Sequence, residues 1–351
     1  MNLNCYIKPY KALYKGSKMT DRKVTLSEVA KRAGVSLGAA SKVLNGGTSK
    51  IGVGAEARKR IVEAARQLNY RPNMAASILA GGSSKLIGFF ADTFPHYRTL
   101  RLLQEIERLS GQLGYRIMTS FSHDNIANMK EDYFMLQRYG VTGFICCAHD
   151  YPEFKKEVAD LFADAQNVVF MEKPCIPDMP YVQTSRVRAL TEMIAEAYRK
   201  GFRRFGTMHA YHTAQTERTL REEFKQALRA NDLPVDPNLV FEYPQATEED
   251  PKFRIRMAME KMILPCRPDF LYVDDAPHTV RLRTKLFKAG LDIRIHGGDG
   301  DPLFDDMELG TFDPCYERIA EALLKLLLHP ECRNETPLIE AVYRRQQPEK
   351  K

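Results

Sequence analysis

The first patterned stretch of the chain spaces its apolar residues as one face of a helix does, with Leu26 and Val29 at helical intervals. Thr25 and Glu28 have the spacing of a capping box, in which each side chain accepts a hydrogen bond from the backbone amide of the other residue. Gly34 stands where a helix can end in a left-handed residue. A helix is therefore predicted from just after Thr25 to about Gly34.

Two further helices are predicted close behind the first. Ser36 can cap a helix that runs to about Asn45 and turns Ala40 and Val43 inward. A third stretch, over about 55–68, again has apolar residues at helical spacing. A helix, a tight glycine turn and a second short helix make a helix-turn-helix, and the third helix can close one small core around it.

The chain from Leu86 onward alternates between strand-like apolar runs and amphipathic stretches. The strand-like runs are KLIGFFAD, YRIMTSF, GVTGFICCA, NVVFM, FRRFGTM, PDFLYVDD and DIRIHGGD, and helices are expected at about 100–113, 128–139, 188–200, 216–230, 253–263, 279–289 and 316–328. Repeated alternation of this kind predicts parallel sheets, and the length of this region suits two doubly wound subdomains. No apolar run approaches the length of a membrane span.

Charge divides the 351 residues into a basic head and an acidic body. Residues 19–85 hold twelve Lys and Arg against four Asp and Glu, and residues 1–18 hold four lysines and no acid. Because the whole chain carries +7, residues 86–351 sum to −5. This distribution is expected when one module contacts phosphates and the other does not, although a lysine-rich solvated face is the alternative.

The start of the chain and its cysteines indicate a cytoplasmic protein. Residues 1–18 lack the apolar segment and cleavage site of a secretory signal, and Met19 would make a natural start, so residues 1–18 are expected to lie outside the fold. The seven cysteines show no CxxC spacing, which fits a reducing compartment. A metal site at Cys146, Cys147 and His149 would lack a second ligand pair, so small buried residues are favoured there and no cofactor is expected.

A long segment of the head resembles a known family. VTLSEVAKRAGVSLGAASKVLNGG and ARKRIVEAARQLNYRPNMAASILAGGSSKLIGFF are similar to the start of regulators in the lactose/galactose-repressor family of bacterial transcription regulators. A weaker, collinear likeness continues through GFRRFGTM, PDFLYVDD, LDIRIHGGDGDP and LGTFDPCYERIAEALLKLLL. The resemblance implies an all-α helix-turn-helix headpiece and an α/β core like that of periplasmic binding proteins, with a ligand cleft at the carboxyl ends of strands.

The resemblance also implies which residues contact DNA. The recognition helix in the major groove would present Ser36, Leu37, Gly38, Ser41 and Lys42, phosphates would be contacted by Thr25, Asn45 and Tyr70, and a hinge helix in the minor groove would use Asn73, Ala76 and Leu79. Leu79 would wedge between base pairs, which unstacks one step and allows bending. Since the hinge is too short to be a stable helix alone, it is expected to fold only when two copies meet on DNA.

Three departures from the family pattern affect DNA recognition. Lys42 replaces the usual arginine, which reduces bidentate readout of guanine to a point-charge contact. Gly38 has no side chain to read a base, and the segment GGTSKIGVGAE is longer than in the lactose repressor. Direct readout is therefore expected to involve few base contacts, among them a contact of Leu37 with a thymine methyl. More of the specificity is expected to come from DNA deformability. Packing or solvation is the alternative role for Leu37 and Ser41.

Polar residues near the ends of the predicted strands are candidates for a ligand site. They are Asp92, Tyr97, Glu172, Arg221, Asp274 and Asp299. Carboxylates there would accept hydrogen bonds from sugar hydroxyls, and the resemblance implies ligand contacts for Asp274 and Asp299. Arg221 lies one residue beyond the place of the family's arginine, and Glu223 replaces the family's glycine, which weakens a simple sugar assignment. Helix capping is the alternative role for each acid.

Together these features predict a sequence-specific transcription regulator, a repressor that binds a pseudo-palindromic operator as a homodimer and responds to a sugar or related metabolite. The expected parts are a disordered basic extension 1–22, a helix-turn-helix domain 23–72, a hinge and linker 73–85, an effector-binding and dimerisation domain 86–345 and a tail 346–351. The alternatives are a nonspecific DNA-binding protein and a solute-binding protein without a genomic target. An enzyme is not expected, because the acids at 299–306 lack calcium-loop spacing and a P-loop and a GxSxG elbow are absent.

Overall fold

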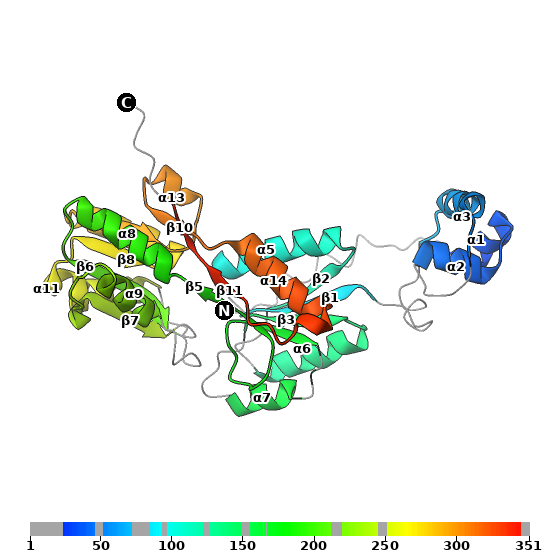
Figure 1. The fold of residues 1–351 in the computed structure, drawn as a ribbon, viewed down its shortest axis with the longest axis horizontal. Helices are drawn as coiled ribbons and strands as arrows, with labels where there is room; N and C mark the ends of the chain where they lie inside the picture. Colours follow the sequence, from blue (N-terminus) through cyan, green and yellow to red (C-terminus); the bar gives the residue numbers. More distant parts are fainter. Residues whose placement is uncertain are drawn as a thin grey trace, which may run out of the picture. The chain divides into compact units, whose positions relative to one another are not determined.

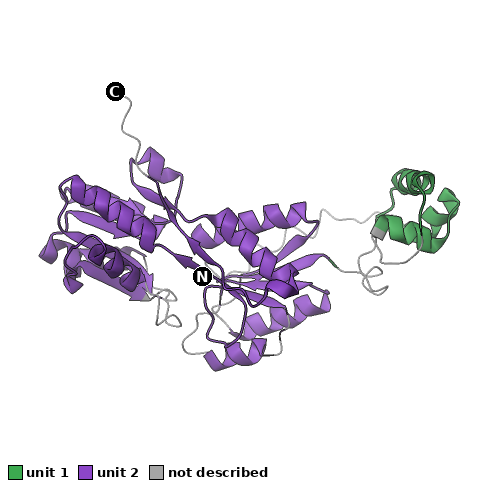
Figure 2. Cartoon of the chain, viewed as in Figure 1, with its two compact units in different colours: residues 1–84 green, residues 85–351 purple. Residues whose placement is uncertain are grey.

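The computed structural model describes residues 24–45, 52–71, 84–92, 97–121, 126–148, 155–163, 165, 167–211, 220–244 and 251–344. The chain divides into two compact units, residues 1–84 and residues 85–351, which Figure 2 colours separately and which are taken here one at a time. The predicted extension 1–22, residues 73–83 of the predicted hinge and linker 73–85, and the predicted tail 346–351 lie outside the described residues, and the predicted domain limits stay predictions.

Unit 1 is built from three helices, α1 (Leu26–Ala33), α2 (Leu37–Asn45) and α3 (Ala55–Gln67). The capping box is present, since the amide of Thr25 donates to Glu28 Oε2 at 2.8 Å and the amide of Glu28 donates to Thr25 Oγ1 at 3.3 Å. Gly34 ends α1 with a φ of 65°, which glycine adopts without the steric cost that a Cβ would add. The small core comprises Val29, Ala30, Ala33, Ala40, Ile61, Ala64 and Ala65.

The first lobe of unit 2 is a six-stranded parallel sheet in the order β11-β5-β4-β3-β1-β2. Its strands are β1 (Leu86–Phe90), β2 (Arg116–Ser120), β3 (Gly143–Cys146), β4 (Val168–Met171), β5 (Tyr181–Ser185) and β11 (Leu338–Glu340), and its helices are α5 (Tyr97–Gln112), α6 (Ile126–Arg138), α7 (Lys155–Phe162) and α14 (Tyr316–Leu328). Alternate residues of β1 face opposite layers. Phe89 packs with Ile106 of α5 and Leu323 of α14, whereas Phe90 packs with Tyr133 of α6. Figure 1 shows α5 and α14 together on one face of this sheet.

The second lobe is a four-stranded parallel sheet in the order β7-β6-β8-β9. Its strands are β6 (Phe205–Tyr211), β7 (Val240–Pro244), β8 (Phe270–Val273) and β9 (Arg294–Gly297), and its α-helices are α8 (Val187–Arg199), α9 (Leu220–Arg229), α10 (Pro251–Ala258), α11 (Leu264–Cys266), α12 (Ala276–Lys288) and α13 (Leu303–Asp306). This lobe also has the short helical turns η4 (Pro237–Leu239) and η5 (Met259–Ile263), whereas η6 (Pro330–Cys332) follows α14 of the first lobe. Tyr272 of β8 packs with Leu190 of α8 on one face, and Val273 packs with Leu282 of α12 on the other.

The chain passes between the two lobes three times. It leaves the first sheet after β5 and enters α8, returns from β10 (Thr311–Asp313) into α14, and leaves again from β11 into β12 (Val342–Arg344). β10 and β12 pair antiparallel, with Phe312 opposite Tyr343. The two doubly wound parallel subdomains expected from the sequence are therefore confirmed.

The element limits differ from the prediction in a few places. The helix expected over 253–263 is α10 followed by a π-helical turn, η5. Strands β5, β7, β11 and β12 and helices α7 and α13 were not predicted. Within the described ranges, no helix is long and apolar enough to span a bilayer.

Candidate DNA-binding and ligand-binding sites

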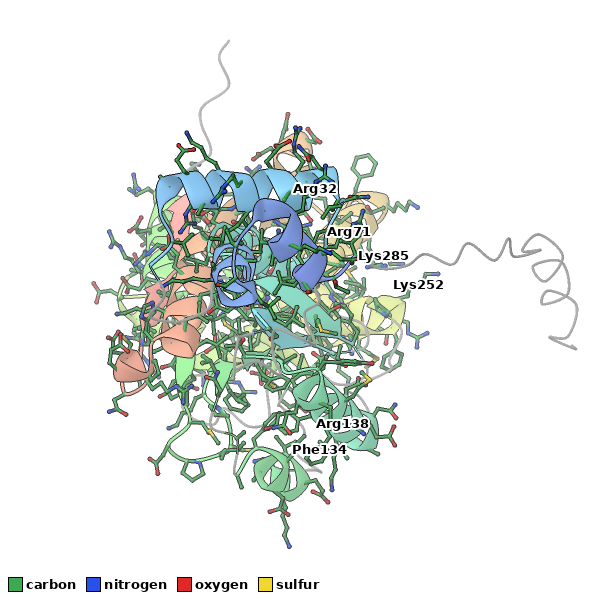
Figure 3. All side chains as sticks on the ribbon, turned by 90° about the vertical axis from the view of Figure 1, so that its right-hand side faces the viewer. Arg32, Arg71, Phe134, Arg138, Lys252 and Lys285 are labelled. Atoms are coloured by element: carbon green, nitrogen blue, oxygen red, sulfur yellow. The ribbon has the colours of Figure 1, made fainter. Side chains whose placement is uncertain are left out.

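Unit 1 keeps its basic side chains at the surface. Its described residues, 24–45 and 52–71, include eight Lys and Arg against three Glu. Lys31, Arg32, Arg58, Lys59, Arg60, Arg66 and Arg71 are exposed, and Figure 3 labels Arg32 and Arg71. Two of the glutamates pair with basic residues of their own helix, Glu56 with Lys59 at 3.5 Å and Glu63 with Arg66 at 3.0 Å. The described surface of unit 1 is therefore net positive, as a surface that meets phosphates should be.

The residues predicted to enter the major groove lie at the start of α2. The amide of Ala39 donates to Ser36 Oγ at 3.2 Å, so the serine caps this helix. Leu37 is 54% exposed, an apolar side chain that the core of unit 1 leaves in solvent. Ser41 and Lys42 are half-buried one turn further on. The positive end of the helix and an exposed apolar side chain thus occur together, a combination that suits phosphate and thymine-methyl contacts.

The remaining DNA-contact candidates divide into two groups. The side chain of Thr25 takes part in the capping box, and Tyr70 packs against the core of unit 1. The side chain of Asn45 and the residues Asn73, Ala76 and Leu79 lie outside the described residues. Their roles stay predictions.

In unit 2, two predicted ligand residues meet at the carboxyl ends of neighbouring strands. Asp274 follows β8 and Asp299 follows β9, and both are buried, with exposures of 4% and 1%. Tyr272 donates its hydroxyl to Asp274 Oδ1 at 2.8 Å. The amide of Ala276 donates to Asp299 Oδ2 at 2.8 Å. These bonds fix the two carboxylates side by side.

Two arginines that the sequence analysis did not single out bind these carboxylates. Arg98, on α5 of the first lobe, places Nη1 2.9 Å from Asp274 Oδ2 and Nε 3.4 Å from Asp299 Oδ1. Arg186, at the crossing between β5 and α8, places Nε 3.3 Å from Asp274 Oδ1 and Nη1 3.7 Å from Glu223 Oε2. Glu223, which replaces a glycine of the family pattern, thus serves as a partner for Arg186. We call Arg98, Arg186, Glu223, Asp274 and Asp299 the inter-lobe cluster.

Burial and the arginines set the protonation of the inter-lobe cluster. Burial alone would raise the pKa of Asp274, but Arg186 and Arg98 outweigh it and hold that pKa well below its usual range. Burial raises the pKa of Asp299 to about 7, with Arg98 opposing the rise and Asp274 adding to it. Asp274 is therefore the ionised partner of both arginines, and Asp299 is the group that exchanges a proton near neutral pH.

Three further ligand candidates stand at the carboxyl edge of the first sheet. Asp92 follows β1 and Glu172 follows β4. Burial raises the pKa of the Cys147 thiol, and the negative charges of Asp92 and Glu172 raise it further. Both acids therefore lie near Cys147, which directly follows β3. Glu172 Oε1 accepts a hydrogen bond from the amide of Thr184 at 3.2 Å. Tyr97 begins α5, next to Arg98.

The remaining ligand candidate, Arg221, has a different partner. It pairs with Glu242 of β7 and is 46% exposed. Both residues line a cavity of about 440 Å³ beside β7, together with Tyr211, Pro237, Asn238, Val240, Phe241, Lys261 and Met262. No ion pair joins Arg221 to Asp274 or Asp299 within the described chain; Arg98 and Arg186 occupy that role.

Metal binding has no support in the described residues. They contain no group of three His, Cys, Asp or Glu that could hold an ion. Asp301 instead accepts a hydrogen bond from the amide of Leu303 at 2.9 Å, at the start of α13. His149, a candidate ligand beside Cys146 and Cys147, lies outside the described residues.

The three-helix basic unit has the fold of a helix-turn-helix headpiece, and the two parallel lobes linked by three crossings have a fold like that of periplasmic binding proteins. Residues 25–73 match the family model described as bacterial regulatory proteins, lacI family.

Named relatives cover parts of the chain. The sucrose operon repressor of Klebsiella pneumoniae is 28% identical over 179 residues, which are 50% of this chain and 52% of the relative. The fructose operon regulatory protein of Vibrio cholerae is 35% identical over 102 residues, 29% of this chain and 31% of the relative. The matched region thus spans about half or less of the length of these two relatives. Both are regulators by name.

Solved structures share the fold over most of the chain. The lac repressor dimer bound to operator and the anti-inducer ONPF has a TM-score of 0.72 at 19% identity, covering 92% of this chain and 98% of that one. The transcriptional regulator CelR in complex with cellobiose has a TM-score of 0.61 at 17% identity, covering 92% and 99%. At these identities the likeness shows the fold alone.

Proposed function

We propose that this chain is a sequence-specific DNA-binding transcription regulator, a repressor whose affinity for its operator is controlled by a small ligand. The match of residues 25–73 to the lacI-family model carries the proposal. The net positive surface of unit 1 supports it, because backbone phosphates supply much of the affinity of DNA-binding proteins. Since its target is the bacterial genome, we place its action in the cytoplasm and propose no enzymatic activity.

On DNA, we propose a homodimer on a pseudo-palindromic operator. In each copy, α2 enters a major groove with Ser36, Leu37, Gly38, Ser41 and Lys42 facing the bases, Thr25, Asn45 and Tyr70 contact phosphates, and Asn73, Ala76 and Leu79 act in the minor groove. The fold similarity to a repressor dimer on its operator supports this arrangement. The exposed Leu37 supports the orientation of α2.

In the body, we propose a ligand site where the carboxyl ends of the strands of both lobes meet. It comprises Asp92, Tyr97 and Glu172 of the first lobe and Asp274 and Asp299 of the second, with Arg221 at the margin. The inter-lobe cluster supports this placement, because Arg98 links the lobes through the same two aspartates. A ligand that alters these contacts shifts the equilibrium between arrangements of the two lobes. If the ligand changes the affinity for DNA by some factor, DNA must change the affinity for the ligand by the same factor.

The experiment that tests DNA recognition starts from selection of duplexes from a random-sequence library by the full-length protein. Fluorescence anisotropy then compares a selected duplex with a scrambled one over a salt series. We expect the selected duplex to bind about 10³-fold or more tightly at physiological salt, with both affinities falling as salt rises. Equal affinities and equal salt slopes would contradict sequence-specific recognition.

A pair of variants tests the role of α2. Lys42→Ala is expected to weaken binding to the selected duplex by about 1–3 kcal/mol, because it removes a cation from the proposed groove-facing surface. Lys59→Ala removes the same charge from the exposed side of α3, where the lysine pairs with Glu56, and serves as the matched control. Equal losses of duplex affinity in the two variants would show that only net charge matters and would contradict the placement of α2 in the major groove.

A further inference from the structure

The two arginines of the inter-lobe cluster have hydrogen-bonding capacity left over. A guanidinium carries five N–H donors. Arg98 uses Nη1 and Nε, and Arg186 uses Nε and Nη1, so within the described structure neither Nη2 has a hydrogen-bond or ion-pair partner. The two side chains are 20% and 22% exposed. Neither Nη2 is among the fully buried atoms that lack a partner in the described residues, so both can donate to a ligand that supplies acceptor oxygens.

The same cluster also has an unused acceptor. Asp299 is 1% exposed, and among the described residues its Oδ1 has no hydrogen-bond partner; its neighbour of opposite charge there is Arg98 Nε at 3.4 Å. The other oxygen, Oδ2, is held by the amide of Ala276. When Asp299 is ionised, this oxygen can accept a hydrogen bond from a ligand hydroxyl without breaking an existing bond. The site therefore offers cationic donors and a hydroxyl acceptor next to each other.

We propose that the small ligand of this chain is a monoanionic polyhydroxy carboxylate, a sugar acid rather than a neutral sugar. Its carboxylate binds Arg98 and Arg186 through their Nη2 groups, and a neighbouring hydroxyl donates to Asp299 Oδ1. This inference deepens the proposed function and rests on it, because it names the chemical class that the proposed ligand site selects.

Charge decides between the ligand classes. Asp274 lies 2.9 Å from Arg98 and 3.3 Å from Arg186, Asp299 lies 3.4 Å from Arg98, and Glu223 lies 3.7 Å from Arg186. A ligand carboxylate makes charge-assisted hydrogen bonds there, which are about twice as strong as those of a neutral hydroxyl. A phosphate dianion carries a second charge toward Asp274, Asp299 and Glu223 and is disfavoured by like-charge repulsion. Among charged ligands, one with a single negative charge therefore meets the least repulsion.

The two arginines also belong to different parts of the body. Arg98 is on α5, which packs against the first sheet, and Arg186 is at the crossing that leads into the second lobe. One carboxylate bound by both side chains ties α5 to that crossing. Arg98 and Arg186 are therefore specificity-determining residues whose contacts with ligand affect the relation between the lobes.

The test compares matched ligands on the full-length wild-type protein by isothermal titration calorimetry. Each set contains an aldonic acid, the neutral sugar and the sugar phosphate of one carbon skeleton: gluconate, glucose and glucose 6-phosphate, then the galactose series. We expect at least one acid to bind about tenfold or more tightly than its neutral and phosphorylated counterparts. If a neutral sugar or a phosphate binds as well as the matching acid, or if no acid binds, the proposal is overturned.

Variants then locate the contact. Arg98→Gln and Arg186→Gln are each expected to weaken binding of the preferred acid about tenfold or more, and Arg98→Lys, which keeps the charge but loses the planar fork, to weaken it less. Arg108→Gln on α5 and Arg188→Gln on α8, the helix that begins just after Arg186, remove exposed arginines and are the matched controls. Losses as large in the controls would overturn the assignment.

Binding of the selected duplex is measured on the same wild-type preparation. A chain that binds its duplex but prefers neutral sugars contradicts only the ligand class. A chain that binds no duplex in dilute salt contradicts the proposed function itself. The two failures are therefore distinguishable.

Discussion

Unit 1 and the body of the protein place their charged side chains differently. In unit 1 seven basic side chains are exposed, and the core contains only Val, Ala and Ile. In the body, Arg98 and Arg186 bind Asp274, which is 4% exposed, and Asp299 beside them is 1% exposed. Surface charges act over about a Debye length and are screened by salt, whereas buried charges are screened much less and respond to pH and to partners.

Because of this difference, binding of a partner to each region depends on different solution conditions. A partner of unit 1 is attracted through exposed charge, so its binding depends on ionic strength. A partner of the inter-lobe cluster must replace or complete buried ionic contacts, so its binding depends on protonation and on exact donor placement.

The largest effect is expected at Asp274. Asp274→Ala removes the shared partner of Arg98 and Arg186 and leaves two largely buried guanidiniums without it. Breaking a buried ion pair by removing one partner typically costs about 3–5 kcal/mol. Calorimetry of the full chain should show a lower melting temperature for the body and an unchanged transition for unit 1.

The control for this variant is Asp292→Ala, because Asp292 is exposed on the second lobe. A surface change of this kind is expected to stay within about 0.5 kcal/mol. If Asp274→Ala melts like the control, water already reaches the cluster and its charges are not buried in solution.

The corresponding test of unit 1 is Ile61→Ala. Ile61 is fully buried and is the largest side chain of a core made mostly of alanines. The substitution is expected to cost about 2–5 kcal/mol, which is comparable to the total stability of a small domain. Binding to the selected duplex should be lost, while ligand binding by the body is retained.

Val62→Ala is the matched control, because the neighbouring valine is 52% exposed. It should leave binding to the duplex within a factor of about three. Retention of duplex binding by Ile61→Ala would show that unit 1 draws its stability from somewhere other than this core.

A third prediction concerns pH and the proton on Asp299. Burial raises its folded pKa to about 7, above its ordinary value, so the folded protein holds a proton that the unfolded chain releases. This group therefore favours folding at low pH, and its contribution is lost as pH rises through 7. Between pH 6 and pH 8 the change is about 1.4 kcal/mol for one proton.

Two buried histidines oppose this trend. Burial lowers the pKa of His209 to about 4 and that of His296 to about 3, so the unfolded chain gains protons there as pH falls below about 6.5. The measurement is therefore the difference in unfolding free energy between wild type and Asp299→Asn at each pH. The variant should gain about 1.4 kcal/mol relative to wild type on going from pH 6 to pH 8. A constant difference would place the proton elsewhere.

How much of this could be read from the sequence depends on how local each feature is. The capping box at Thr25 and the turn at Gly34 were predicted because their signals lie within ten residues. Asp274 and Asp299 were identified because strand-end carboxylates meet at one edge of a parallel sheet. The strands β5, YVQTS, and β7, VFEYP, were missed because their polar residues interrupt the apolar run.

Arg98 and Arg186 were missed for a different reason. Neither stands at the end of a predicted strand, and each acquires its role only when the chain crosses between lobes and brings it to Asp274. Contacts between residues 98 and 274 depend on the packing of two sheets, which no short sequence window encodes. Arg221, one residue from the position of the family's arginine, instead pairs with Glu242.

The smallest expected effect is on the cap of α1. Thr25→Ala removes the hydroxyl that accepts the amide hydrogen of Glu28, and N-cap substitutions of this kind cost about 1 kcal/mol. Thr25→Ser keeps the hydroxyl and is the matched control. Because Thr25 is also a proposed phosphate contact, the readout is the melting transition of unit 1 without DNA, which should fall for alanine and stay near wild type for serine. Equal melting of the two variants would mean that the cap adds nothing to unit 1, and any loss of duplex binding would then report the phosphate contact alone.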